Sequence, residues 1–207
     1  NIYDNKNLSQ DVKEIVDILS TCTNLSGINI NSSNLYGEIP SNIQLLKDLE
    51  YFNICYNKIS GTIPKECFML SKLKSLYLYN NLISGAIPTN FDHEISNLKE
   101  LNLSHNNLVG SIPDWFSKLT PTCNIVLSGN RLQGEIALSF ITSRSNWDYQ
   151  KEAIIFQQNG VLSMPDKYAP LKNYNIKGID NSSYKIHDYF LAHKYTIVYL
   201  TSLDSQY

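Results

Sequence analysis

The sequence predicts an α/β repeat solenoid, a right-handed superhelix in which each unit adds one strand to a parallel β-sheet on the concave face. One segment recurs five times, and its polar position after the predicted strand lies at intervals of 24, 24, 25 and 24 residues. That position is occupied in turn by Ser33, Asn57, Asn81, Asn106 and Asn130. Since one unit alone cannot bury its apolar side chains, regular repetition predicts that the units stack and share a core.

Each unit opens with two apolar residues separated by one polar residue. Side chains two positions apart on a strand point to the same face, so these pairs are expected to point inward and to stack. The pairs are Ile28 and Ile30, Phe52 and Ile54, Leu76 and Leu78, Leu101 and Leu103, and Ile125 and Leu127.

The remaining positions of the unit follow in order. An asparagine at the end of the strand is expected to be buried and to bond backbone groups of its own and neighbouring turns, forming a ladder in which Ser33 is the weak rung. A glycine comes next, followed in four units by Ile-Pro. A further apolar side is then predicted from Ile43, Cys67, Phe91, Phe116 and Phe140.

The pattern LxxLxLxxNxLxGxIP resembles the plant-specific class of leucine-rich repeat. That class is known from extracellular receptor-like proteins, receptor kinases and polygalacturonase-inhibiting proteins. The resemblance covers about residues 19 to 140 and identifies a scaffold, so it implies ligand recognition only as a class.

We expect three parts. Residues 1–18 form a degenerate repeat or the remnant of an N-terminal cap, residues 19–140 hold the five repeats, and residues 141–207 form an irregular tail, an island-like segment or a C-terminal cap. In this last part AIIFQQNGVL from Ala153 could be a degraded strand with Asn159 in the asparagine column. We also expect the chain to begin within a solenoid, as a fragment, because the cysteine-bearing caps that the resemblance implies are not recognisable.

Composition restricts the possible partners. The net charge is −2, with 17% charged and 43% hydrophobic residues, which argues against nucleic acid and acidic lipid. Because no apolar run reaches 18 residues, no membrane contact is expected within the chain.

Five N-x-Ser/Thr sequons favour an extracellular or cell-surface location and glycosylation. They lie at Asn7, Asn24, Asn31, Asn102 and Asn181. The four cysteines give little information about the compartment. Cys22 and Cys67 occupy positions usually filled by leucine, and buried or free thiols are favoured over a disulfide bridge.

No catalytic constellation, metal site or cofactor site is expected. The four histidines are scattered, and HDYFLAH from His187 lacks the i, i+4 spacing of a zinc site. The triplet Asp92-His93-Glu94 lies where one repeat is a residue longer, which favours a solvated bulge over an acid–base pair. The chain is therefore not expected to be an enzyme.

The outward positions of the strands and turns form the candidate ligand-binding surface. Same-column residues become neighbours about 4.8 Å apart in a parallel sheet, which gathers aromatic and polar side chains from three successive units. The candidate ligand-binding residues are Tyr51, Asn53, Tyr56, Tyr77, Asn80, Glu100 and His105. Tyrosine is common at recognition sites, although it also suits any exposed strand.

Two functions fit these features. The first is an extracellular recognition module of receptor-like or inhibitor-like type that binds a protein or peptide on the concave face, with a co-receptor as a further candidate partner. The alternative is a carbohydrate- or cell-wall-associated protein that binds a glycan through the same rows.

Overall fold

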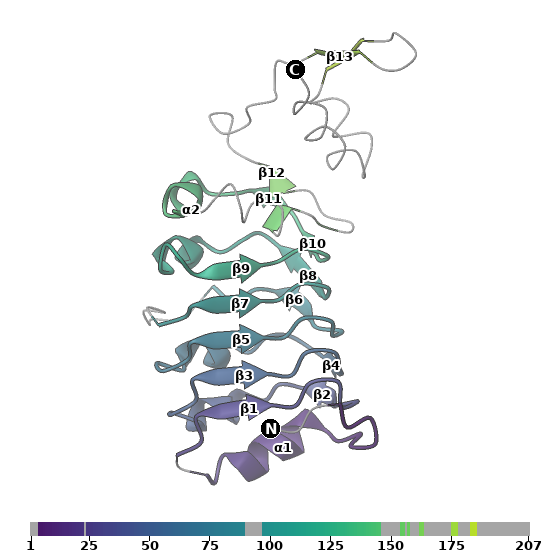
Figure 1. Cartoon of the computed structure of the whole chain (residues 1–207), viewed down its shortest axis with the longest axis vertical. Helices are drawn as coiled ribbons and strands as arrows, with labels where there is room; N and C mark the ends of the chain where they lie inside the picture. Colours follow the sequence, from purple (N-terminus) through teal and green to yellow (C-terminus); the bar gives the residue numbers. More distant parts are fainter. Residues whose placement is uncertain are drawn as a thin grey trace. The chain divides into compact units, whose positions relative to one another are not determined.

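The computed structural model describes residues 4–22, 24–89, 97–145, 154–155, 157, 162–163, 175–177 and 183–185. The chain divides into two compact units, Asn1–Ser163 and Met164–Tyr207. The first is a stack of coils, with the strands of successive coils lying side by side (Figure 1). In the second, β13 (Asn175–Lys177) pairs with β14 (Ser183–Lys185) in antiparallel fashion.

Five parallel strands form one sheet along the stack. They are β1 (Gly27–Asn29), β3 (Tyr51–Asn53), β5 (Ser75–Tyr77), β7 (Glu100–Asn102) and β9 (Asn124–Val126), in that order. The register runs through Ile28, Phe52, Leu76, Leu101 and Ile125, which are partners in succession. The predicted repeat solenoid with a parallel sheet is therefore confirmed. We call the outward side of this sheet the strand face.

A second series of short parallel strands lies after the asparagine column, where the sequence analysis predicted none. Its pairs and triplet are β2 (Tyr36–Glu38) with β4 (Lys58–Ser60), β6 (Ser84–Ala86) with β8 (Asn107–Gly110) and β10 (Arg131–Leu132), and β11 (Gly134–Glu135) with β12 (Leu162–Ser163). Gly37 has φ +86° within β2, and a Cβ there would meet the Asp11 side chain. Glycine at this position thus allows a left-handed backbone and lets the neighbouring coil approach closely.

A short helix closes most coils on the side away from β1–β9. These are the 3-10 helices η1 (Ser41–Leu45), η2 (Lys65–Met69) and η3 (Asp114–Lys118), and α2 (Leu138–Thr142). Each 3-10 helix is preceded by a proline in extended conformation. The proline ring fixes φ at about −65°, which suits the residue just before the helix.

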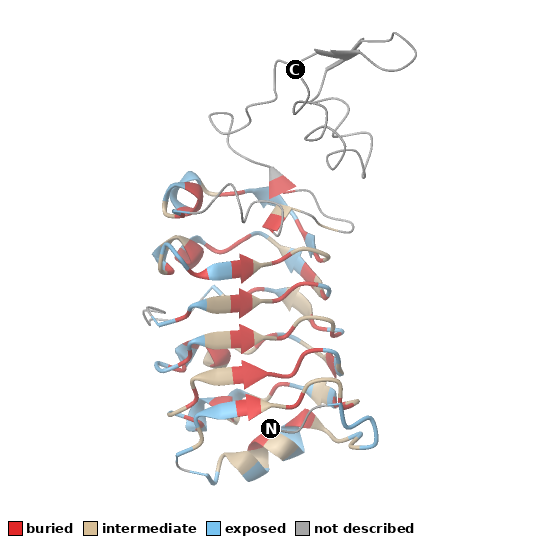
Figure 2. Cartoon of the chain, viewed as in Figure 1, coloured by how far each residue is buried: buried red, intermediate tan, exposed pale blue. Residues whose placement is uncertain are grey.

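The core fills the space between strands and helices, and buried residues mark the inner positions of every described coil (Figure 2). The helices contribute Ile43, Cys67, Phe116 and Phe140, all buried as predicted; Phe91 lies outside the described residues. Rings also join successive coils, because Phe116 meets Phe140 edge-on with centroids 5.7 Å apart. The Trp115 Nε1–H donates to the Pro88 carbonyl oxygen at 2.8 Å.

The N-terminal residues form a coil stacked on the first complete repeat. Here α1 (Val12–Leu19) begins at Asp11, whose carboxylate accepts a hydrogen bond from the Lys13 amide, and it buries Val12 and Val16. The Tyr36 amide donates to the Gln10 carbonyl oxygen at 3.1 Å, which joins this coil to β2. The buried side of the helix thereby packs against the first complete repeat.

Solenoid contacts continue beyond Phe140. The Gln157 Oε1 accepts from the Leu132 amide at 3.1 Å, and Gln157 Nε2 donates to the carbonyl oxygens of Leu127 and Ile154 at 3.1 and 2.8 Å. Gln157 thus makes the contacts that were expected of Asn159, which itself lies outside the described residues. The division of the chain at residues 18 and 140 stays a prediction.

Candidate ligand-binding surface

The asparagine ladder shapes the turn at the end of each strand. The Asn81 Oδ1 accepts from the Ile59 amide at 3.0 Å, while its Nδ2 donates to the carbonyl oxygens of Ile54 and Leu78, each at 3.0 Å. Equivalent bonds are made by Asn57, Asn106 and Asn130. One amide therefore ties its own turn to the preceding coil, as predicted.

Burial of the ladder differs from the prediction at one rung. Asn81, Asn106 and Asn130 are buried, whereas Asn57 is half-buried. The rung before Asn57 is Ser33, whose shorter side chain covers less of its neighbour and instead donates to the Asn31 carbonyl oxygen at 2.9 Å.

The residue immediately before each rung has a left-handed backbone. This column consists of Ser32, Tyr56, Asn80, His105 and Gly129, with φ of 51°, 54°, 53°, 54° and 72°. A positive φ is uncommon for residues other than glycine, so four of the five units hold a strained turn. The turn directs Tyr56 and His105 to the edge of the strand face, where both side chains are exposed.

Two tyrosine pairs lie on or beside the strand face. Tyr51 and Tyr77, from β3 and β5, have ring centroids 5.6 Å apart with planes at 59°. Tyr56 and Tyr79, from the turns that follow these strands, have centroids 5.2 Å apart in an edge-to-face arrangement. Aromatic rings prefer such tilted contacts, which hold each ring in a defined orientation.

Asn53, at the third position of β3, is less accessible than predicted. It is buried, with 7% of its surface exposed, although its amide lies on the predicted outward side beside the Tyr51 hydroxyl. Its Oδ1 accepts from the Cys55 amide at 3.1 Å, and its Nδ2 donates to the Tyr51 hydroxyl at 3.1 Å. A short polar side chain at a strand end can bond the backbone two residues on, and this bond keeps the amide close to the main chain.

The Tyr77 and Tyr79 hydroxyls stay protonated at neutral pH, because the pKa of each is raised above its ordinary value. Burial, and then the charge of Glu100, raise the pKa of Tyr77. A hydrogen bond with the Cys55 thiol and then burial raise the pKa of Tyr79. The Tyr77 hydroxyl can therefore donate a hydrogen bond to a ligand, whereas the Tyr79 hydroxyl is already bonded to Cys55.

Glu100 supplies a carboxylate at the start of β7. Its Oε2 accepts from Asn124 Nδ2 at 2.9 Å, and its side chain lines a hollow of about 380 Å³ together with Asn97, Lys99, Thr120 and Thr122. This places Glu100 at the edge of the sheet opposite to Tyr56 and His105, because it begins a strand whereas they follow one.

The predicted site residues therefore form two groups. Tyr51, Tyr77 and Glu100 lie on the strands, and Tyr56, Asn80 and His105 lie along the turn edge. Tyr79 was not among the candidate residues, and it belongs with the second group through its ring contact with Tyr56. Their ligand-binding role stays a prediction.

The sequons differ in exposure. Asn7 and Asn24 are exposed, Asn31 and Asn102 are half-buried, and Asn181 lies outside the described residues. The Asn102 Oδ1 accepts from the Ser104 amide and hydroxyl at 3.1 and 2.7 Å.

All four cysteines are free thiols. Cys55, Cys67 and Cys123 are buried, and burial raises the pKa of Cys123 to about 12. Cys22, predicted at a core position, is exposed because it follows the end of α1 rather than lying on its buried side.

The described residues hold neither a metal-binding cluster nor a membrane-spanning helix. Within them no group of three or more His, Cys, Asp or Glu side chains could hold a metal ion, while His93, His187 and His193 lie outside them. In the same part of the chain, no helix has both the length and the apolar character needed to cross a bilayer.

Comparison with known proteins decides the family. Two family models match, described as "Leucine rich repeat" over residues 71–132 and "Leucine Rich Repeat" over residues 48–70. The ectodomain of BIR2 from Arabidopsis thaliana is 30% identical with a TM-score of 0.52, and the match covers 68% of this chain and 69% of that one. This chain belongs to the leucine-rich repeat family.

Two other solved structures share this fold. The Arabidopsis receptor kinase HAESA, in complex with the peptide hormone IDA and the co-receptor SERK1, is 31% identical with a TM-score of 0.51. That match covers 57% of this chain and 20% of the HAESA chain. A plant ice-binding protein, 24% identical with a TM-score of 0.54, shares the fold over 67% of this chain and 51% of its own. Among curated proteins there is no match.

Proposed function

We propose that this leucine-rich repeat chain is an extracellular ligand-recognition module of receptor-like or inhibitor-like type, which binds a protein or peptide across the strand face. The observation that carries the proposal is the presence of two ordered tyrosine pairs on consecutive coils, Tyr51 with Tyr77 and Tyr56 with Tyr79. Aromatic rings whose rotamers are already held lose little freedom when a ligand binds, so they favour recognition.

The comparisons support this choice of ligand. HAESA is a leucine-rich repeat receptor kinase in complex with a peptide hormone and a co-receptor. A strand face with aromatic surface, phenol donors and a carboxylate suits an extended peptide, which offers main-chain carbonyl and amide groups at regular spacing. A co-receptor is a further candidate partner, and glycosylation at the exposed Asn7 and Asn24 fits an extracellular location.

A parallel screen tests the proposal. The chain is panned against a displayed library of random dodecapeptides and, separately, applied to a glycan array. We expect convergent peptide sequences, and we expect the double variant Tyr51→Ala/Tyr77→Ala to weaken their binding at least about tenfold, because buried aromatic contacts dominate such interfaces.

The matched control is Tyr36→Ala, which removes a tyrosine that is 47% exposed on β2, in the other series of strands. Its affinity for the selected peptides should match that of the wild type. Unchanged affinity of the double variant with an unchanged melting temperature would contradict binding at the strand face, and selection of glycans without peptides would favour the carbohydrate alternative.

A further inference from the structure

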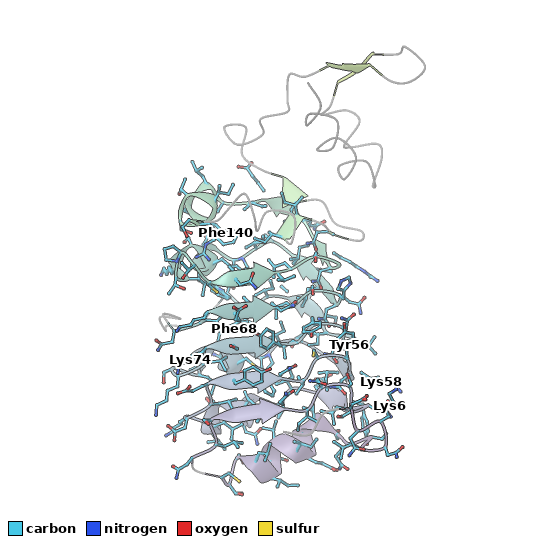
Figure 3. All side chains as sticks on the ribbon, in the orientation of Figure 1. Lys6, Tyr56, Lys58, Phe68, Lys74 and Phe140 are labelled. Carbon is cyan, nitrogen blue, oxygen red and sulfur yellow. The ribbon has the colours of Figure 1, made fainter. Side chains whose placement is uncertain are left out.

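A hollow of about 430 Å³ lies at the turn edge of the first repeats. Its lining comes from three coils. Lys6 comes from the N-terminal coil, and Ser32 and Asn34 come from the turn after β1. Tyr56 and Asn57 come from the turn after β3, and Lys58 begins β4. Figure 3 shows Lys6, Lys58 and Tyr56 together on one side of the solenoid. Residues that are 52 positions apart in the sequence thus converge because the coils stack.

The charge of the hollow is not balanced by its own lining. Two of the six lining residues are lysines, and none carries a carboxylate. Lys13, Lys72 and Lys74 each form an ion pair at 2.5–2.6 Å, with Asp17, Asp48 and Glu50. No such pair is found for Lys6 or Lys58 among the residues that the structure describes, and both lysines are exposed.

Tyr56 gives the hollow an ordered apolar wall. Its side chain is 56% exposed, yet its ring stands edge-on to Tyr79 with centroids 5.2 Å apart. Its backbone is held in the left-handed region by the turn, and the next residue, Asn57, is anchored through its amide to the Ile30 carbonyl oxygen at 2.8 Å. The turn and the contact with Tyr79 therefore hold an exposed aromatic ring in a defined orientation.

We propose that this hollow binds a carboxylate of the peptide ligand. The two lysine ammonium groups would bind the carboxylate oxygens, and the Tyr56 ring would contact the apolar part of the same ligand residue. The inference rests on the proposed function, because the Tyr56–Tyr79 pair joins the hollow to the strand face, so a peptide crossing that face would place one end here.

Chemical protection of individual lysines tests the subsite without a natural ligand. The folded chain is acetylated at a limiting reagent concentration, and the rate at each lysine is measured by mass spectrometry with and without a probe. The carboxylate probes are N-acetyl-phenylalanine, which represents a peptide C-terminus, and N-acetyl-aspartate α-amide, which represents an acidic side chain. N-acetyl-phenylalaninamide is the neutral control, and galacturonate represents an acidic sugar.

We expect at least one carboxylate probe of the peptide type to slow acetylation of Lys6 and Lys58 about threefold or more. The exposed Lys47 and Lys65 should be unaffected, and so should all lysines with the neutral amide. Which of the two probes protects identifies the source of the carboxylate. Equal protection by the amide, protection spread over all lysines, or protection by galacturonate alone would each overturn the proposal.

Lysine variants test whether Lys6 and Lys58 belong to one subsite. Lys58→Gln should abolish protection of Lys6, and Lys6→Gln should abolish protection of Lys58, whereas Lys65→Gln should change neither. If both lysines remain protected independently, the shared subsite is refuted. If the lysines are protected but the library screen selects no peptides, the subsite is supported and peptide recognition is contradicted. If peptides are selected but bind both lysine variants as they bind the wild type, peptide recognition is supported and the subsite is refuted.

Discussion

Asn81 shows how much of the fold depends on single polar side chains. Its amide bonds backbone groups of two coils, so both its donor and its acceptor satisfy main-chain atoms that water cannot reach. The bonds matter because a buried backbone group without a partner costs more than a formed bond contributes.

Replacing that residue tests the ladder. Asn81→Leu should lower the free energy of unfolding by about 1–3 kcal/mol, since the Ile59 amide loses this partner. The carbonyl oxygens of Ile54 and Leu78 each lose one donor and keep a second, from Asn57 and Asn106. Denaturant unfolding measures the change. Asn107→Leu is the matched control, because the Asn107 side chain is half-buried and has no hydrogen bond among the described residues. Equal stability of the two variants would show that the ladder contributes little.

The left-handed column allows a second test at the same scale. A Cβ built on Gly129 would lie 2.6 Å from His105 Nδ1, and Gly129 has φ +72°. Gly129→Ala should therefore lose about 1–2 kcal/mol of stability from the backbone alone, with a further loss from the histidine contact.

A double-mutant cycle separates the two losses. His105→Gly removes the ring and relieves its own positive φ, so it should stabilise the chain by up to about 1 kcal/mol. Gly129→Ala should then cost less in the His105→Gly background than in the wild type, by about 0.5 kcal/mol or more in thermal or denaturant unfolding. Strict additivity would show that the ring moves aside without cost.

Among the elements, α2 and the residues after it mark where the repeats change character. Arg144 is buried and directly follows Ser143, which occupies the column that holds leucine at positions 46, 70 and 119. Its guanidinium donates to the carbonyl oxygens of Leu119 and Cys123 at 2.7 and 3.2 Å and lies over the Phe140 ring, 5.5 Å from its centroid. One cation therefore satisfies the end of one coil and packs on the helix of the next.

Lysine is not expected to replace Arg144 without a loss of stability. Arg144→Lys should lower the free energy of unfolding by about 2 kcal/mol, because an ammonium group cannot bond both carbonyls in a fixed fork or stack on Phe140. Arg131→Lys provides the control, since Arg131 is exposed, and it should change stability by less than about 0.5 kcal/mol. Similar effects of the two substitutions would mean that only the positive charge matters.

At the scale of the whole solenoid, stability should vary along the stack. The inner strands β3, β5 and β7 each pair on both sides, whereas β1 and β9 each pair with one strand of the same sheet. In native-state hydrogen exchange we expect the amides of β5 to be the slowest and protection to fall toward both ends, because repeat stability depends on neighbour contacts. Uniform protection from β1 to β9 would instead indicate one fully cooperative unit.

The sequence predicted the features that repeat and missed those that depend on contacts between particular coils. Strand positions, register and ladder followed from the period, because every unit repeats the same columns. The low exposure of Asn53 was missed because alternation cannot show that an outward side chain bonds its own backbone and the Tyr51 hydroxyl. Gln157 was missed because its spacing from Asn130 departs from the period, and the Lys6–Lys58 hollow because its two lysines come from distant coils.

The ladder has one more consequence, for the kinetics of folding. Its side-chain bonds between coils join residues from 22 to 30 positions apart, the limits being Leu35 with Asn57 and Leu127 with Gln157. The entropy lost in closing a loop grows only with the logarithm of its length, so each of these closures costs about the same. No step has to bring distant ends of the chain together before contacts form. Folding can therefore start at whichever pair of coils forms first and extend coil by coil in both directions.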